Sequence, residues 1–135
     1  MIVVIDINCL LASIPPQGDH YWLYLAFEER RFDWLISNEI IMEYEERLVS
    51  GYSQKAANLV LYTLSVASNV IFDEPYFKWN LVGQDPDDNK FADLAIAGSA
   101  DYLVTNDKHF NPLKTIEFPK LNIVNLGEFK EIIWG

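Results

Sequence analysis

Short, mainly apolar runs recur along the chain and are separated by longer segments in which apolar residues are spaced more widely. The runs are rich in β-branched and aromatic residues, a composition typical of strands buried inside a sheet. We predict strands at Ile2–Ile5, Phe32–Ile36, Asn69–Phe72, Tyr102–Thr105 and, near the end of the chain, Asn122–Asn125. The first of these strands ends at Asp6, which would direct an acidic side chain towards a pocket.

Between the predicted strands, apolar residues recur every three or four positions, which is the spacing of an amphipathic helix. The predicted helices are His20–Arg31, a segment capped by Ser37 or Asn38 and running through Leu48, Ser53–Ala67, a segment from a cap at Asp87 or Asp88 to about Ser99, and Gly127–Ile133. Asp73–Asp87 contains two prolines and a glycine and is predicted to be a loop, with a short extended piece around Lys78–Val82.

Helices and strands therefore alternate along the whole chain. This alternation indicates the α/β class, with a central, mainly parallel sheet flanked by helices in a three-layer domain and with right-handed crossovers. The 135 residues suffice for one domain with a real core, so we assign 1–135 to a single domain. In open parallel sheets, ligands bind beyond the carboxyl ends of the strands, where the strand order reverses.

Composition narrows the classes of protein that the chain can represent. Half of the residues are hydrophobic, which excludes wholesale disorder. The 20 acidic and 10 basic residues give a formal net charge of −10, which repels nucleic acid at long range. Any nucleic-acid partner must therefore be held by local contacts that overcome this repulsion. Cys9 is the single cysteine and cannot form an intrachain disulfide, which fits a reducing compartment.

The N-terminal sequence does not resemble a targeting segment. It has no cationic region, and Asp6 and Asn8 interrupt its apolar run, so it matches neither a signal peptide nor a membrane span. We therefore expect a cytoplasmic protein without a membrane partner.

Four acidic residues are placed to meet at one edge of the predicted sheet. Asp6 and Asp107 follow predicted strands, Asp88 stands in the first turn of a predicted helix, and Glu43 borders the apolar face of another helix. Clustered carboxylates repel one another unless a cation relieves them. Oxygen ligands suit Mg²⁺ or Mn²⁺, so we predict a site for one or two of these ions.

Each of these acids also has an ordinary structural explanation. Asp6 and Asp107 could be turn residues, Asp88 could be a helix N-cap, and Glu43 could pair with Arg47 one turn further along its helix. Glu39, Glu45 and Glu46 are neighbours of Glu43 and could replace it in the site. The two histidines, His20 and His109, show no metal-ligand spacing and are expected to be surface residues.

The motifs that carry these acids resemble those of a known family. A hydrophobic strand followed by Asp6-Ile7-Asn8, the helical Glu43, and the segment DPDDNKFADLAIAGSADYLVTND from Asp85 to Asp107 are similar to the PIN domain, specifically the toxins of bacterial toxin–antitoxin pairs. The similarity covers nearly the whole chain, and the segment from Asp85 to Asp107 is its most specific part.

The resemblance implies a Mg²⁺- or Mn²⁺-dependent endoribonuclease of PIN-like fold. Its acidic quartet corresponds to Asp6, Glu43, Asp88 and Asp107, with Asn8 and Thr105 as polar supports, while Asp85 and Asn89 are peripheral candidates and Lys90, Lys108 and Lys114 could hold flanking RNA phosphates. It also implies a cognate antitoxin as partner and a possible homodimer. Metal-bound water would attack the phosphodiester, so no protein nucleophile is required.

Other readings of the sequence remain open at this stage. A catalytically silent PIN-like module that binds RNA or protein is the main alternative, and the net charge of −10 favours it. An aspartate-nucleophile phosphatase would need a second aspartate at the position of Asn8. A receiver domain would need a phosphoacceptor aspartate after a middle strand, where the chain has Ser37.

Overall fold

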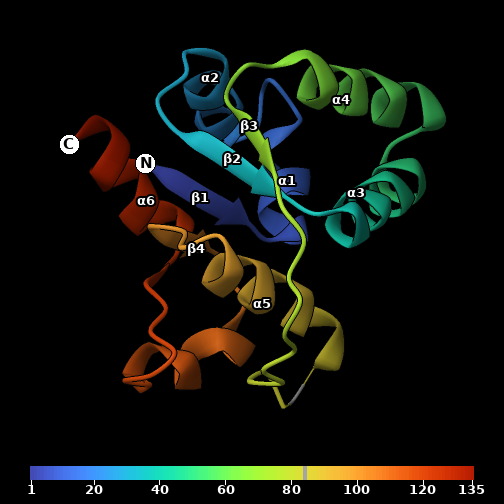
Figure 1. Cartoon of the computed structure of the whole chain (residues 1–135). Coiled ribbons are helices and arrows are strands. Elements are labelled where there is room, and N and C mark those ends of the chain that lie inside the picture. The colour runs from blue at the N-terminus through green and yellow to red at the C-terminus, as the bar shows by residue number, and fades with distance from the viewer. Residues whose placement is uncertain (84) are drawn as a thin grey trace.

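A five-stranded sheet forms the centre of the computed structural model, which describes residues 1–83 and 85–135 (Figure 1). The strands are β1 (Ile2–Ile5), β2 (Asp33–Ile36), β3 (Val70–Phe72), β4 (Tyr102–Val104) and β5 (Ile123–Val124). Their order is β3-β2-β1-β4-β5, and each neighbouring pair is parallel. The α/β class and all five predicted strands are confirmed.

The predicted helices are also present, with ends that differ by a few residues. They are α2 (Tyr21–Glu28), α3 (Asn38–Gly51), α4 (Gln54–Val66), α5 (Asn89–Ala97) and α6 (Leu126–Trp134). Ser37 and Ser53 cap α3 and α4, because their hydroxyl oxygens accept hydrogen bonds from Ile40 N and Ala56 N. Helix α2 ends earlier than predicted, and Arg30 just beyond it has a left-handed φ of 58°.

Three helical segments were not predicted from the sequence: α1 (Ile7–Ser13) and the 3₁₀ segments η1 (Pro86–Asp88) and η2 (Lys108–Thr115). Asp88 occupies the N-cap position of α5, as one of the two expected alternatives, but its side chain makes no capping hydrogen bond there. The preceding η1 is capped by the Asp85 carboxylate, which accepts a hydrogen bond from Asp87 N. The expected loop is present over 73–83, and position 84 within it lies outside the described residues. The extended piece expected at 78–82 is interrupted at Asn80, which has a left-handed φ of 53°. That loop is tied to α5, where Asn89 Oδ1 accepts from Val82 N.

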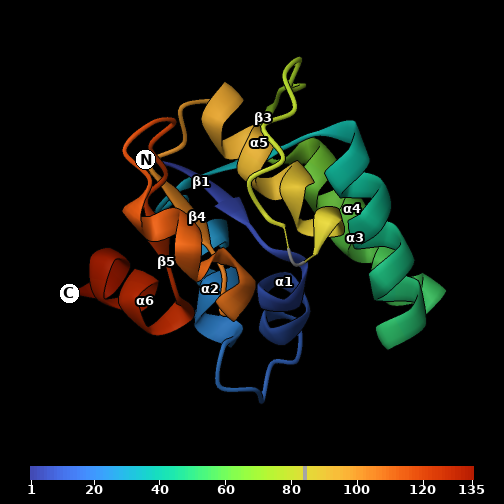
Figure 2. The same ribbon diagram turned by 90° about the horizontal axis from the view of Figure 1, so that it is seen from below.

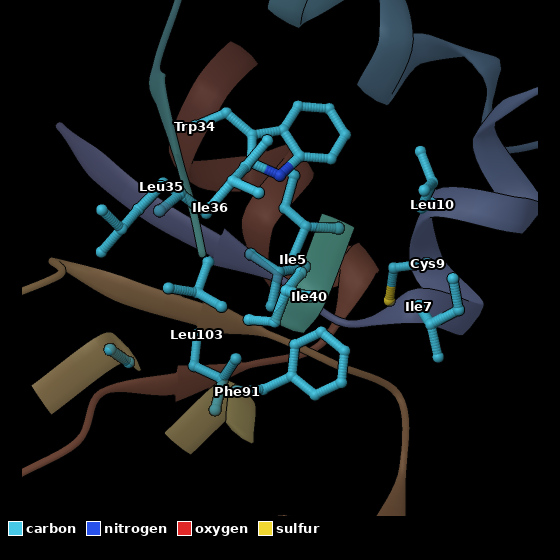
Figure 3. Packing of buried hydrophobic residues seen from close by; sticks show 14 of the residues in the cluster. Ile5, Ile7, Cys9, Leu10, Trp34, Leu35, Ile36, Ile40, Phe91 and Leu103 are labelled. Carbon is cyan, nitrogen blue, oxygen red and sulfur yellow. The ribbon is translucent and has the colours of Figure 1, made fainter. Parts of the chain in front are cut away.

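Helices cover both faces of the sheet and make a three-layer domain. On one face, Gly98 at the end of α5 lies so close to Leu35 that a Cβ atom there would be 2.4 Å from Leu35 Cδ2. On the other face, the rings of Phe27 from α2 and Phe129 from α6 pack on Phe32. Figure 3 shows buried side chains on both sides of the strands. Helix α6 and the α3–α4 pair lie at opposite ends of the sheet (Figures 1 and 2).

The strand order reverses at the centre of the sheet. The chain proceeds from β1 outwards through β2 and β3, then returns to place β4 on the other side of β1. Ile5 is in register with Val104, and Asp6 N donates to Val104 O at 3.0 Å. The residues that follow β1 and β4 are therefore neighbours at the reversal point, where α/β sheets bind ligands.

Among the helices in the described part of the chain, none has the length and apolar character needed to cross a membrane.

Candidate active site

A cleft of about 470 Å³ opens at the carboxyl ends of β1 and β4, next to α3 and α5. Its lining residues are mostly polar: Ile7, Asn8, Glu39, Met42, Glu43, Glu46, Arg47, Asp85, Asp87, Asp88, Lys90 and Asp107. Three of the four predicted acids, Glu43, Asp88 and Asp107, line this cleft directly. The fourth, Asp6, is only 1% exposed.

Asp6 nevertheless belongs electrostatically to the same group of acids. Burial raises the pKa of its carboxyl above the ordinary value, the hydrogen bond from Thr105 opposes this shift, and the charges of Asp107 and Glu43 raise the pKa further. Asp6, Asp88 and Asp107 thus repel one another at one edge of the sheet, and Glu43 adds its charge to that of Asp6. A bound cation relieves repulsion between carboxylates placed in this way.

Thr105 connects two of the acids. Its hydroxyl donates to Asp6 Oδ2 at 2.7 Å and accepts from Asp107 N at 3.0 Å, and the residue is 4% exposed. One buried side chain therefore fixes both the orientation of the Asp6 carboxylate and the backbone that carries Asp107. This placement agrees with the prediction that Thr105 orients the acids of the site.

Replacing Thr105 with valine is expected to weaken the site and the fold together. The variant keeps the shape of the side chain but leaves the Asp6 carboxylate and Asp107 N unpaired, which should lower the free energy of unfolding by about 1–3 kcal/mol. Metal affinity should fall about 10- to 100-fold, the usual effect of losing a group that orients a ligand. Urea unfolding and titration calorimetry measure the two effects. Thr115→Val, at an exposed threonine, is the control, and equal behaviour of both variants would contradict the role of Thr105.

Asp88 is the least satisfied acid of the cleft. It is 8% exposed, and within the described residues its Oδ2 atom has no hydrogen-bond partner. Burial, followed by the charges of Asp6, Asp85 and Asp107, raises the pKa of the carboxyl to about 7. Its side chain makes no capping hydrogen bond to α5, so the ordinary explanation as an N-cap does not apply. A buried carboxylate oxygen without a hydrogen-bond partner is suited to hold a cation.

The raised pKa of Asp88 predicts an unusual pH dependence of stability for the metal-free chain. Between the ordinary carboxyl pKa and about 7, the folded state retains a proton that the unfolded state has released. Stability should therefore fall as the pH rises from 5 to 8, by about 2 kcal/mol from this carboxyl after allowing for solvent screening.

Urea unfolding at pH 5 and pH 8 in EDTA measures this difference. Asp88→Asn should remove most of it, and Mg²⁺ or Mn²⁺ should restore wild-type stability at pH 8. A wild-type protein that is more stable at pH 8 than at pH 5 in EDTA would contradict the assignment.

Glu43 has a partner that the sequence did not indicate. Lys90 Nζ, from the first turn of α5, forms an ion pair with Glu43 Oε2 of α3, and the two side chains are only 14% and 18% exposed. The expected alternative partner, Arg47, lines the cleft instead. Lys90, predicted as a phosphate contact, thus has its ammonium group on one of the predicted metal ligands.

The remaining predicted residues are distributed around the cleft. Asn8 is exposed on its wall, and Asp85 lines it while capping η1. Asn89 holds the preceding loop through Val82 N and does not line the cleft. Lys108 and Lys114 border a second cleft of about 410 Å³, which shares Asp107 with the first.

Glu39 and Glu46, which were expected as possible replacements for Glu43, line the cleft together with it, and so does Arg47. One residue beside the acids was not predicted to belong to the site. His109, expected at the surface, is half-buried, and its Nδ1 atom lies 3.4 Å from Asp107 Oδ1. The signal in this case was its position two residues after Asp107, because the Asp107 side chain caps η2 by accepting a hydrogen bond from His109 N.

Comparisons with known proteins identify the family and agree with the fold. A family model described as PIN domain matches residues 2–109. One similar structure is a chain of VapBC2 from Rickettsia felis, solved bound to a DNA fragment from its promoter, with a TM-score of 0.62 and 19% identity over 93% of this chain and 98% of that one. Another is a chain of FitAcB from Neisseria gonorrhoeae, with a TM-score of 0.59, 15% identity and the same coverage. No curated protein matches the sequence.

Proposed function

The chain belongs to the PIN domain family, and from that premise we propose that it is a metal-dependent endoribonuclease that hydrolyses RNA phosphodiester bonds. PIN domains are generally nucleases and typically use divalent metals. The observation that carries the proposal is the meeting of Asp6, Glu43, Asp88 and Asp107 at the reversal point of the sheet. Repulsion among these acids is relieved by a bound cation.

The donor set suits Mg²⁺ or Mn²⁺, and the four acids are the residues that would hold it. A bound ion of this kind supplies a water of lowered pKa and neutralises charge on the phosphate. Thr105 keeps the Asp6 carboxylate in one orientation, and Asn8 offers an amide on the wall of the cleft. Burial of Asp6 and Asp88 limits access of bulk water to their oxygens, which strengthens their attraction for a cation.

RNA must approach a protein whose formal net charge is −10. Lys108 and Lys114 border the cleft adjoining the acids, where they could hold phosphates on one side of the scissile bond. This local pair of cations would offset the overall repulsion. Both lysines remain proposed RNA contacts, whereas Lys90 forms an ion pair with Glu43.

Lys90 is expected to compete with the metal for Glu43. Lys90→Met removes a positive charge from the cleft while keeping an unbranched side chain, so Mg²⁺ affinity should rise about 3- to 10-fold, as expected for a charge a few ångströms away in a partly screened site. Titration calorimetry measures the change. Lys55→Met, which removes an exposed lysine on α4, is the matched control. Weaker Mg²⁺ binding by Lys90→Met would show that the ammonium supports the site and does not compete.

A catalytically silent PIN module is the second candidate function. The observation that favours it is the same ion pair, because the Lys90 ammonium offsets the charge of one of the four acids. In that case the chain would bind RNA or protein and would not turn over substrate.

Substrate tests separate these functions. Purified chain is incubated with single-stranded RNA or single-stranded DNA of the same mixed sequence in Mg²⁺ or Mn²⁺. Cleavage of RNA with the DNA left intact is the expected result. Cleavage of both would remove the RNA preference, and RNA binding without cleavage would support the silent module.

We also propose that the chain is the toxin of a toxin–antitoxin pair, acts in the cytoplasm and forms a homodimer. The support is the PIN family together with the similar fold of chains in the VapBC2 and FitAcB structures. Expression of the wild-type chain should arrest growth of a bacterial host, whereas Asp6→Asn should not. Equal growth in both cultures would count against a toxin role.

A further inference from the structure

Three potential metal ligands lie together at the edge of the cleft. Asp85, Asp88 and His109 each offer one ligand atom, and these atoms are all within 4.8 Å of one another. Among the residues that the structure describes, they are the one group of three or more acidic, histidine or cysteine side chains at this spacing. Asp6 and Glu43 are outside the group, so the trio and the predicted quartet share only Asp88.

Two atoms of the trio are buried without a partner. Asp88 Oδ2 and His109 Nδ1 lie 3.8 Å apart, and neither atom has a hydrogen-bond partner in the described part of the chain. Buried polar atoms are nearly always hydrogen-bonded, so an unpaired acceptor facing an imidazole nitrogen indicates a missing ligand. Asp88 is itself buried, with 8% of its surface exposed.

Asp107 does not account for the orientation of His109. Its Oδ1 atom already accepts the backbone hydrogen bond from His109 N at 2.9 Å, and it lies 3.4 Å from His109 Nδ1 without forming a hydrogen bond to it. The backbone hydrogen bond fixes the start of η2 and thereby holds the imidazole beside Asp88.

We propose that Asp85, Asp88 and His109 form a second cation position with one nitrogen donor, which prefers Mn²⁺ to Mg²⁺. This inference rests on the proposed function, because it adds a position beside the metal held by the four acids. Mg²⁺ takes oxygen ligands almost exclusively, whereas imidazole suits the later transition ions and is accepted by Mn²⁺. Sharing of a carboxylate such as Asp88 between two ions is compatible with two-metal phosphodiester chemistry.

The test uses the metal-free full-length chain and does not depend on activity. Mn²⁺ and Mg²⁺ are titrated into the wild type, His109→Gln and His20→Gln, and the Mn²⁺-loaded proteins are examined by pulsed electron paramagnetic resonance for coupling to ¹⁴N. His109→Gln replaces the nitrogen donor with an amide of similar size. His20→Gln is the matched control at the other histidine.

The wild type is expected to show ¹⁴N coupling, which His109→Gln abolishes. The variant should lose about 10-fold or more in Mn²⁺ affinity at one of two positions and change less than about 3-fold for Mg²⁺. His20→Gln should match the wild type. Absence of ¹⁴N coupling in the wild type, or equal losses for both ions, would overturn the proposal.

RNA cleavage by the same preparations separates this inference from the proposed function. Cleavage by a wild type that binds Mn²⁺ without nitrogen coupling would overturn the second position and leave the nuclease intact. Nitrogen coupling in a protein that cleaves no RNA would support the second position and contradict the nuclease.

Discussion

Replacing Asp88 with asparagine is expected to reduce metal-dependent RNA cleavage at least about 1,000-fold, equivalent to about 4 kcal/mol of transition-state stabilisation. Asparagine keeps the shape of the side chain and removes the charge that a cation requires. Asp88 Oδ2 is buried and has no hydrogen-bond partner among the described residues, so its charge is available to a cation. The measurement is kcat/KM for a labelled RNA at saturating Mg²⁺, with circular dichroism to verify folding.

Asp87→Asn is the matched control for this variant. Asp87 also lines the cleft and is exposed, and its backbone N–H, which the substitution leaves in place, donates to Asp85 Oδ1. Its replacement should change kcat/KM less than about 3-fold, since an exposed charge affects mainly the rate at which the protein and the RNA associate. Equal losses for the two variants would mean that the cleft acts through its overall charge and that Asp88 holds no metal.

Tyr44→Phe is expected to have the largest effect on stability among the substitutions considered. The Tyr44 hydroxyl donates to Ile5 O at 2.5 Å and accepts from Trp34 Nε1 at 3.3 Å, and the residue is completely buried. Burial raises the pKa of this hydroxyl, so it keeps its proton as a donor. Its removal leaves a buried carbonyl and a buried indole N–H unpaired, at a cost of about 2–4 kcal/mol in the free energy of unfolding.

Urea unfolding of Tyr44→Phe beside Tyr62→Phe measures this effect. Tyr62 is 65% exposed on α4, and its hydroxyl should contribute less than about 0.5 kcal/mol. Because Ile5 immediately precedes Asp6, the Tyr44 variant should also bind Mg²⁺ more weakly at temperatures where it remains folded. Unchanged stability would show that the hydroxyl does not hold α3 against β1.

The strands and the longer helices were predictable because their signals are local. The apolar run Ile2–Ile5 by itself predicts a strand, and the spacing of apolar residues in α3 by itself predicts a helix. Ser37 and Ser53 are residue types that commonly cap helices, and both do so here. Helix α1 begins one residue after Asp6, without a breaker between strand and helix, so its apolar residues continue the preceding run. The 3₁₀ segment η2 was not predicted for a different reason: it contains Pro112 and lacks the repeated apolar spacing of an α-helix.

The acids of the site were predictable from the rule that ligands bind at the carboxyl ends of strands. Asp6 and Asp107 follow this rule directly. The partners of the acids could not be predicted in this way, because contacts between side chains that are distant in the sequence depend on how the helices and strands pack. Lys90 and Glu43 are 47 positions apart, and His109 Nδ1 lies 3.8 Å from Asp88 Oδ2 although the two residues belong to different elements.

The most direct test of the central claim is the rate at which one preparation of the chain cleaves single-stranded RNA after EDTA treatment and again after Mg²⁺ or Mn²⁺ is restored, measured beside Asp6→Asn. Asparagine at this position can still accept the hydrogen bond from Thr105, so the variant tests charge and not folding. The account predicts no cleavage in EDTA, recovery with either ion, and no recovery in Asp6→Asn. Cleavage that persists in EDTA, or that Asp6→Asn retains, would contradict a metal-dependent nuclease at this site.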